Sequence, residues 1–223
     1  MSGHGKSRTS VVVFDLDGTL VDSLPLVLRA FSHALEPFGP RPTMEIFARL
    51  GGPPERVFFD LLENAGHVPE ALKRLEAFNR DNDHQIKPFA GAGVMLAQLQ
   101  AQGAQLAVWT GRDRLTTDVL LRLHGMTDLF NVVICGDDLP THKPNPQGLR
   151  EIMERLKVQA HETLFVGDAD VDVLGGAACE VDTVLIRHAR EVDADVSAKA
   201  WRIVASPFEA YELVLSRVGE SKA

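Results

Sequence analysis

The sequence predicts an α/β fold, a doubly wound parallel sheet with an all-helical segment inserted after its first strand. Short apolar runs rich in β-branched residues alternate along the chain with helical patterns. Polar residues directly follow several of these runs, at the positions where parallel sheets place their chemistry. One stretch, from about Ser23 to His84, contains helical patterns only. Together these features indicate a sheet-based core and an inserted helical bundle.

The first strand is predicted at Val11–Phe14, a wholly apolar run of the kind found in buried parallel strands. This run leads directly into Asp15-Leu16-Asp17-Gly18-Thr19. Four later apolar runs complete the predicted sheet: Leu106–Trp109, Val132–Ile134, Leu164–Val166 and Thr183–Ile186.

The spacing of apolar residues also predicts the helices between these strands. One helix has Leu115, Val119 and Leu123 on a shared face, and the next has Leu149, Ile152, Met153 and Leu156. The second of these begins with Asn145 as its N-cap and Pro146 in its first turn. A last helix begins at a capping box, Ser206 to Glu209, and carries Tyr211 and Leu215.

The strand-free stretch is predicted to hold several helices separated by glycine and proline. Their apolar positions are Val27/Phe31/Leu35, Ile46/Phe47/Leu50, Val57/Phe58/Leu61/Leu62 and Leu72/Leu75/Phe78. The segment Lys87–Gly91 then brings the chain back to the sheet.

Composition excludes several classes of protein. The chain has 223 residues, 45% hydrophobic and 24% charged, which rules out collagen-like, low-complexity and mostly disordered chains. The formal net charge is −8, whereas proteins that bind a nucleic-acid backbone present a basic face. The longest apolar run, Phe89–Ala97, is far shorter than the ~18 residues of a membrane span. We therefore expect neither a nucleic-acid nor a membrane partner.

The two cysteines and the amino terminus indicate a cytoplasmic protein. Cys135 and Cys179 lie among apolar residues without metal-ligand spacing, so we expect reduced core positions rather than a zinc site. The segment Met1–Ser10 lacks the apolar stretch of a secretory signal.

Four polar clusters lie at the ends of predicted strands, where a doubly wound sheet gathers them in one crevice. They are Asp15 with Asp17, Thr110-Gly111-Arg112, Lys143-Pro144, and Gly167 to Asp172. Open carboxylate oxygens suit Mg²⁺, and a lysine, a hydroxyl and turn amides suit a phosphate. Each cluster alone has a simpler interpretation as a turn, a helix cap or a solvated charge. Their joint occurrence favours a site, while Arg112 and His142 are expected to be surface side chains beside it.

These motifs resemble those of the haloacid dehalogenase-like (HAD) hydrolase superfamily, from Val11 to about Val218. The matching segments are Phe14 to Ser23, Thr110, Lys143 to Pro146, and Val166 to Asp168 with Asp172. The helical insert after the first motif is similar to the cap of the phosphoglycolate phosphatase and β-phosphoglucomutase-like branch. One departure is Gly111-Arg112, which stands where an Asn commonly follows the Thr.

The resemblance implies a HAD-like catalytic core at 1–21 and 88–223 and a specificity cap at 22–87. It implies a Mg²⁺-dependent phosphatase for a small phosphorylated metabolite, phosphoglycolate-like or a sugar phosphate, acting as a monomer or homodimer. Asp15 would be the nucleophile and Asp17 the general acid and base. The implied metal ligands are Asp15, Asp168, Asp172 and the backbone carbonyl of Asp17. Lys143 and Thr110, with backbone amides near Leu16 and Gly111, would hold the phosphoryl oxygens.

The cap would select the leaving group through its loop Gly51-Gly52-Pro53-Pro54. Arg49 and Arg56 flank that loop and are candidate contacts to a substrate anion, although solvated helix-surface arginines are the simpler interpretation. Three alternatives stay open: a phosphomutase, which would return the phosphoryl group to its substrate, a dehalogenase, and a non-catalytic regulatory protein on the same fold. A dehalogenase would need neither Asp17 nor the carboxylates around Asp168.

Overall fold

The computed structural model of the protein describes residues 9–39, 42–43 and 53–220. At its centre lies a six-stranded sheet with the order β5-β4-β1-β6-β7-β8, in which all neighbouring strands are parallel. The strands are β1 (Val11–Phe14), β4 (Gln105–Trp109), β5 (Val132–Ile134), β6 (Thr163–Gly167), β7 (Asp182–Ile186) and β8 (Arg202–Val204). The predicted doubly wound sheet is confirmed. The sequence analysis missed β8, a short edge strand with Arg202 and Ile203 exposed.

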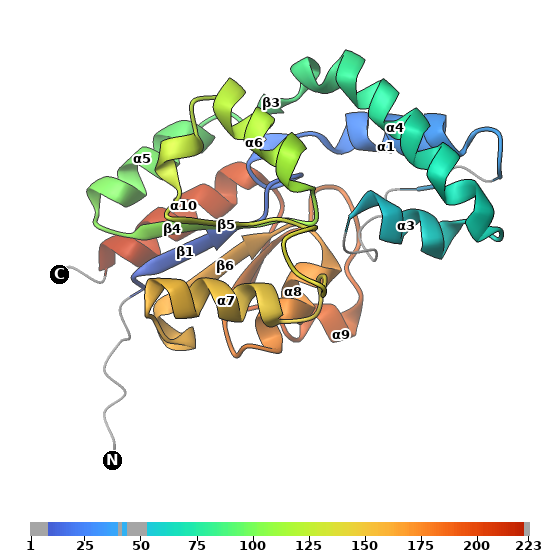
Figure 1. Ribbon diagram of the computed structural model, residues 1–223. Helices are drawn as coiled ribbons and strands as arrows, with labels where there is room; N and C mark the ends of the chain where they lie inside the picture. The colour runs from blue at the N-terminus through green and yellow to red at the C-terminus, as the bar shows by residue number, and fades with distance from the viewer. Residues whose placement is uncertain (1–8, 40–41, 44–52, 221–223) are drawn as a thin grey trace.

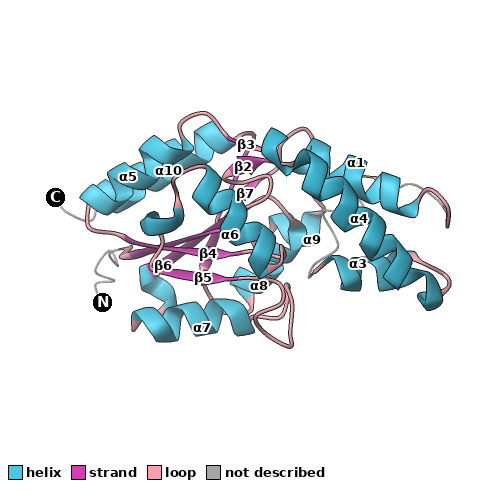
Figure 2. Ribbon diagram, turned by 45° about the horizontal axis from the view of Figure 1, so that its top comes forward, coloured by secondary structure: helices cyan, strands magenta, loops and turns pink. Residues whose placement is uncertain are grey.

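Helices cover both faces of the sheet (Figures 1 and 2). One face carries α5 (Ala92–Ala101), α6 (Arg114–Leu123) and α10 (Pro207–Glu220), and the other carries α7 (Gln147–Leu156) and α8 (Asp170–Ala177). The remaining core elements are the short α9 (Ala194–Ser197) and the 3-10 turns η3 (Thr127–Leu129) and η4 (Ala160–Glu162). Among the described residues, we find no helix with the length and apolar character needed to cross a bilayer.

The central strand β1 supplies both apolar layers, because successive side chains of a strand point to opposite faces. Val12 and Phe14 belong to the cluster that contains Met95 of α5, whereas Val11 and Val13 belong to the cluster with Leu149 of α7. All four β1 side chains are fully buried. This burial fixes the strand in the middle of the sheet, and residue 15 therefore emerges at the centre of its carboxyl edge.

A helical insertion lies between β1 and β4, as the sequence predicted. It contains α1 (Leu24–Leu35), α3 (Pro54–Leu61), η1 (Ala65–His67), α4 (Val68–Asn82) and η2 (Asp83–Gln85). A short antiparallel ribbon of β2 (Val21–Asp22) and β3 (Lys87–Pro88) joins its two connections to the core. The insertion has its own apolar cluster, in which the rings of Phe31 and Phe58 lie 5.0 Å apart. The cap boundaries at residues 22 and 87 stay a prediction, and the helix expected around Ile46 lies outside the described residues.

Two details of the predicted helices are different in the structure. The face of α6 that carries Leu115, Val119 and Leu123 is exposed, with Leu115 at 74% exposure, and the helix packs through Leu120 and Leu121 instead. Helix α7 begins at Gln147 rather than at Pro146, although Asn145 Oδ1 still accepts the Gln147 amide at 3.1 Å. In α10 the Glu209 amide donates to Ser206 Oγ at 3.3 Å, as the predicted capping box requires.

Candidate active site

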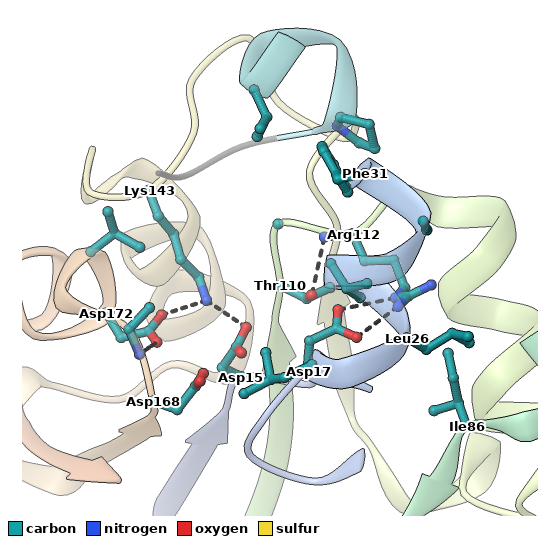
Figure 3. Close-up of a pocket in the computed structure, with 18 of the residues that line it drawn as sticks. Asp15, Asp17, Leu26, Phe31, Ile86, Thr110, Arg112, Lys143, Asp168 and Asp172 are labelled. Carbon is teal, nitrogen blue, oxygen red and sulfur yellow. Dashed lines mark hydrogen bonds and ion pairs between the residues drawn. The ribbon is translucent and has the colours of Figure 1, made fainter. Parts of the chain in front are cut away.

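The carboxyl edge of the sheet and the helical insertion enclose a cavity of about 690 Å³ (Figure 3). The structure brings the four strand-end clusters together in its floor. The predicted residues that line the cavity are Asp15, Asp17, Thr110, Gly111, Lys143, Asp168 and Asp172. This convergence follows from the strand order, because β4 and β6 flank β1 on either side.

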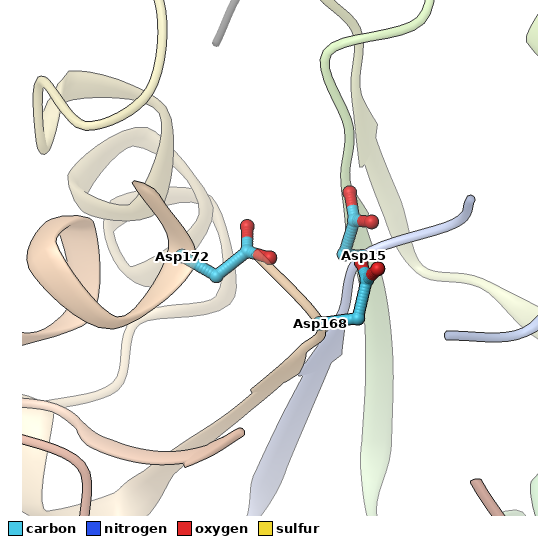
Figure 4. Close-up of side chains that lie close together, drawn as sticks. All are labelled: Asp15, Asp168 and Asp172. Carbon is cyan, nitrogen blue, oxygen red and sulfur yellow. The ribbon is translucent and has the colours of Figure 1, made fainter. Parts of the chain in front are cut away.

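Asp15, Asp168 and Asp172 form a compact group of carboxylates (Figure 4). One oxygen of each lies within 4.8 Å of the others, and all three residues are buried. Asp172 lies in the first turn of α8, where its Oδ2 accepts the Ala169 amide at 3.0 Å. The side chain of Asp17 is not part of this group, so the predicted metal contact of Asp17 depends on its backbone carbonyl.

Lys143 lies between two of these carboxylates. Its Nζ donates to Asp15 Oδ1 at 2.7 Å and to Asp172 Oδ1 at 2.6 Å. The same ammonium lies 5.1 Å from the ring centroid of Trp109 and 5.3 Å from that of Phe165, at cation–π distance. The lysine ammonium thus has both carboxylates and buried aromatic rings as neighbours.

The charges in this group do not balance. The pKa of Asp15 is raised to about 7 in total: burial raises it most, the Lys143 ammonium lowers it, and the Asp172 carboxylate raises it. Burial and the neighbouring Asp15 and Asp172 also raise the pKa of Asp168 well above its ordinary value. Burial alone would lower the pKa of Lys143, but Asp15 and Asp172 outweigh it and raise that pKa. One ammonium faces three carboxyl groups, so the cluster favours further positive charge, supplied by protons or by a metal cation.

Gly18 allows Asp168 to approach the first motif. Its φ of +73° lies in the left-handed region, and a Cβ at this position would come within 2.4 Å of Asp168 Oδ2. A side chain here would displace the carboxylate, so the glycine after Asp17 is a steric requirement of the site.

Asp17 has partners of its own. Arg112 donates to it through two nitrogens, and Ser23 Oγ donates to Asp17 Oδ1 at 2.5 Å. Burial alone would raise the pKa of Asp17, but Arg112 and Ser23 outweigh it and hold that pKa below its ordinary value. The expectation that Arg112 is a surface side chain is wrong: its side chain is 8% exposed and lines the cavity. The pairing with Asp17, which follows the neighbouring strand β1, draws Arg112 inward.

The three residues predicted to hold phosphoryl oxygens beside Lys143, namely Thr110, Gly111 and Leu16, closely follow the strands β4 and β1. Thr110 is buried, and its Oγ1 accepts the Arg112 amide at 3.1 Å. Gly111 lines the cavity. The side chain of Leu16 is fully buried in the core, so any contact of Leu16 with a substrate would come from its backbone. His142, beside Lys143, is half-buried and is not among the described residues that line the cavity.

Of the two candidate arginines of the insertion, Arg56 lies in the described residues, and it does not join this group. Arg56 is exposed, pairs with Asp60 at 3.2 Å and is not among the described residues that line the cavity. Arg49 lies outside the described residues.

Sequence reasoning missed a further strand-end pair, His188 and Arg190, which line the cavity after β7. His188 Nε2 donates to the Gly18 carbonyl at 2.8 Å and lies 4.0 Å from Asp168 Oδ2. Arg190 Nη2 lies 2.7 Å from Asp170 Oδ1 and donates to the Asp168 carbonyl at 2.9 Å. The signal was present, because both residues follow a predicted strand as closely as the other clusters do.

A doubly wound sheet with buried carboxylates and a lysine at its strand ends, beneath a helical insertion, defines a phosphatase-type hydrolase. Residues 12–186 match the family model described as haloacid dehalogenase-like hydrolase, and the chain belongs to this family. The match runs from Val12 in β1 to the end of β7 and includes the four predicted strand-end clusters, whereas His188 and Arg190 follow it.

Relatives agree with this family. Pyrophosphatase PpaX of Halalkalibacterium halodurans is 32% identical over 190 residues, which cover 81% of this chain and 84% of the relative. A Haemophilus somnus protein, assigned by prediction as a phosphoglycolate phosphatase, superposes with a TM-score of 0.77 at 19% identity and covers 94% of this chain and 100% of its own. A Thermotoga maritima protein assigned in the same way as a β-phosphoglucomutase superposes with a TM-score of 0.71 at 22% identity, covering 93% and 99%. These two structural likenesses concern the fold alone.

Proposed function

We propose that the protein is a Mg²⁺-dependent phosphatase of small phosphomonoesters, with Asp15 as the nucleophile. The observation that carries the proposal is the position of Asp15, at the end of β1, on the cavity floor and in contact with Lys143. A carboxylate can attack phosphorus and form an aspartyl-phosphate, which divides one difficult displacement into two easier ones.

The cluster of three carboxylates suits a hard divalent cation. Asp15, Asp168 and Asp172 offer oxygen ligands within 4.8 Å of one another and carry more negative charge than Lys143 neutralises. These side chains, with the backbone carbonyl of Asp17, would hold Mg²⁺. When bound, the ion shields the approach of the carboxylate to a phosphate dianion.

Lys143 and Thr110 would bind the phosphoryl oxygens during the transfer. The ammonium already touches Asp15, and the Thr110 hydroxyl lies on the cavity floor beside Gly111. Donors fixed before the substrate arrives need little reorganisation as charge develops on those oxygens.

Asp17 would move the protons. In the first step an oxygen of Asp15 bonds to phosphorus, the ester P–O bond breaks, and Asp17 gives its proton to the leaving oxygen. In the second step water attacks phosphorus, Asp17 takes its proton, and the bond between phosphorus and Asp15 breaks. A carboxyl whose pKa is held low by Arg112 is a weak proton donor. This role therefore requires the ion pair with Arg112 to open when substrate binds.

The test is phosphate release from p-nitrophenyl phosphate, with Mg²⁺ and with EDTA, and from a panel of small phosphate esters. Pyrophosphate belongs in the panel because the curated relatives are named pyrophosphatases. We expect Mg²⁺-dependent release that EDTA abolishes. Equal rates with Mg²⁺ and with EDTA would contradict the proposal and revive the dehalogenase alternative.

A further inference from the structure

The wall of the cavity that faces the carboxylates belongs to the helical insertion and is mainly apolar. Its apolar side chains are Leu24, Leu26, Val27, Ala30, Phe31, Val57, Leu75 and Ile86. Figure 3 shows Leu26, Phe31 and Ile86 on the insertion side, opposite Asp15 and Lys143. A leaving group bound beyond the phosphoryl site would lie against this surface.

The cations that line the cavity, within the described ranges, are all paired already. Lys143 contacts Asp15 and Asp172, Arg112 contacts Asp17 at 2.7 Å, and Arg190 contacts Asp170 at 2.7 Å. All three belong to the core, and no described lining residue of the insertion is a lysine or an arginine. A second anion on the substrate could therefore bind one of these three cations only by competing with the carboxylate that already contacts it.

Among the described lining residues of the insertion, the one with an ionisable side chain is the carboxylate Asp83. Asp83 lines the cavity from η2, one helical turn beyond Asn79 of α4. A carboxylate on the leaving group would meet Asp83 as a like charge and would lose water without gaining an ion pair. An apolar group would instead gain by leaving water.

We propose that the preferred substrate is a phosphomonoester whose leaving group is uncharged and largely apolar, and that a second anionic group on it is disfavoured. This inference rests on the proposed phosphatase function and adds the chemical class of the leaving group. It separates alkyl and similar esters from esters that carry a carboxylate or a further phosphate.

A matched pair of substrates tests the inference on the whole protein. Hexyl phosphate and 6-phosphonooxyhexanoate share the ester oxygen and the carbon chain, and only the second ends in a carboxylate. We expect kcat/KM to be about 10-fold or more higher for hexyl phosphate, and to rise along ethyl, butyl and hexyl phosphate. A ratio of one or less, or no rise with chain length, would overturn the inference.

Two variants test whether the cavity wall is the cause. Asp83→Asn removes the negative charge with little change of shape, and Val27→Lys places a cation in the wall. Both should lower the preference for hexyl phosphate by about threefold or more. Their controls are Asp81→Asn, at an exposed position outside the lining, and Val94→Lys, at a position of α5 that is 64% exposed. An unchanged preference in both cavity variants would overturn the inference even if wild-type protein prefers hexyl phosphate.

The outcomes separate this inference from the proposed function. Hydrolysis of both esters with the carboxylate ester preferred would contradict the apolar leaving group and leave the phosphatase intact. Absence of Mg²⁺-dependent phosphate release from every ester, including p-nitrophenyl phosphate, would overturn both.

Discussion

Arg112 and Asp17 form a two-point ion pair: Nε lies 3.0 Å from Oδ2, and Nη2 lies 2.7 Å from Oδ1. The residues are 95 positions apart in sequence but follow the adjacent strands β4 and β1. The planar guanidinium matches the carboxylate in shape, so the pair fixes the orientation of Asp17 as well as its charge. Asp17 is therefore paired with Arg112, whereas Asp15 and Asp172 both contact Lys143.

We predict that Arg112→Ala lowers the free energy of unfolding by about 1–3 kcal/mol at pH 7 in EDTA, because it removes two of the hydrogen bonds to a partly buried carboxylate and its cationic partner. The ion pair holds the pKa of Asp17 below its ordinary value, so its stabilisation is present above about pH 4 and disappears as pH falls through the lowered pKa. The difference between variant and wild type should therefore shrink toward pH 3. Urea denaturation at both pH values measures it.

The control for this prediction is Arg155→Ala, which removes an exposed pair with Glu151 of 2.8 Å. Exposed pairs contribute about 0–1 kcal/mol, so this variant should be close to wild type at both pH values. If Arg112→Ala behaved like the control, the pair would contribute little to stability.

We predict that Asp15→Asn lowers phosphatase turnover by at least about three orders of magnitude, because an amide does not attack phosphorus at a useful rate. Removal of one of three clustered carboxylates also relieves repulsion, so the metal-free melting temperature should be no lower than that of wild type. Acid-quenched wild-type protein should gain the mass of one phosphoryl group during turnover, and the variant should not. Turnover that persisted in a contaminant-free variant would exclude Asp15 as the nucleophile.

We predict that Mg²⁺ raises the melting temperature of the wild type and has a much smaller effect on Asp168→Ala. An ion that binds only the folded state adds about 2.7 kcal/mol at 100 times its Kd, and loss of a ligand raises that Kd. Ca²⁺ should bind yet support little activity, because its larger and looser coordination misplaces the nucleophile. Asp128→Ala, at an exposed position of η3, is the control and should respond to Mg²⁺ as wild type does. Equal responses in Asp168→Ala and wild type would place the ion elsewhere.

We predict opposite outcomes for two leucines of α6. Leu120→Ala removes a buried core side chain and should destabilise the protein by about 2–5 kcal/mol. Leu115→Ala changes a side chain that is mostly exposed and should alter stability by less than about 0.5 kcal/mol. Thermal or urea unfolding of the two variants checks the direction in which the helix faces; similar losses in both would contradict the described packing.

The sequence by itself determined five of the six strands of the sheet and the floor of the site. Val11–Phe14 is wholly apolar, so it had to be a buried strand, and Asp15 and Asp17 had to follow it at the carboxyl edge. The same rule placed Thr110, Lys143 and Asp168 at that edge, because parallel strands all end on one side. It applied equally to His188 and Arg190, which the sequence analysis did not use.

The tertiary structure decided the contacts between side chains that local periodicity does not describe. Arg112 turns inward because it pairs with Asp17, which follows the adjacent strand. Leu115 faces outward because α6 packs against the core through Leu120 and Leu121. The apolar wall of the cavity likewise depends on how α1 and α4 pack over the sheet edge, and its α1 residues are more than 100 positions from Lys143 and Asp168 in sequence. The spacing of apolar residues in the sequence shows whether a segment is a helix or a strand and where it ends. Two side chains far apart in sequence come into contact only when the elements that carry them pack together in one defined arrangement.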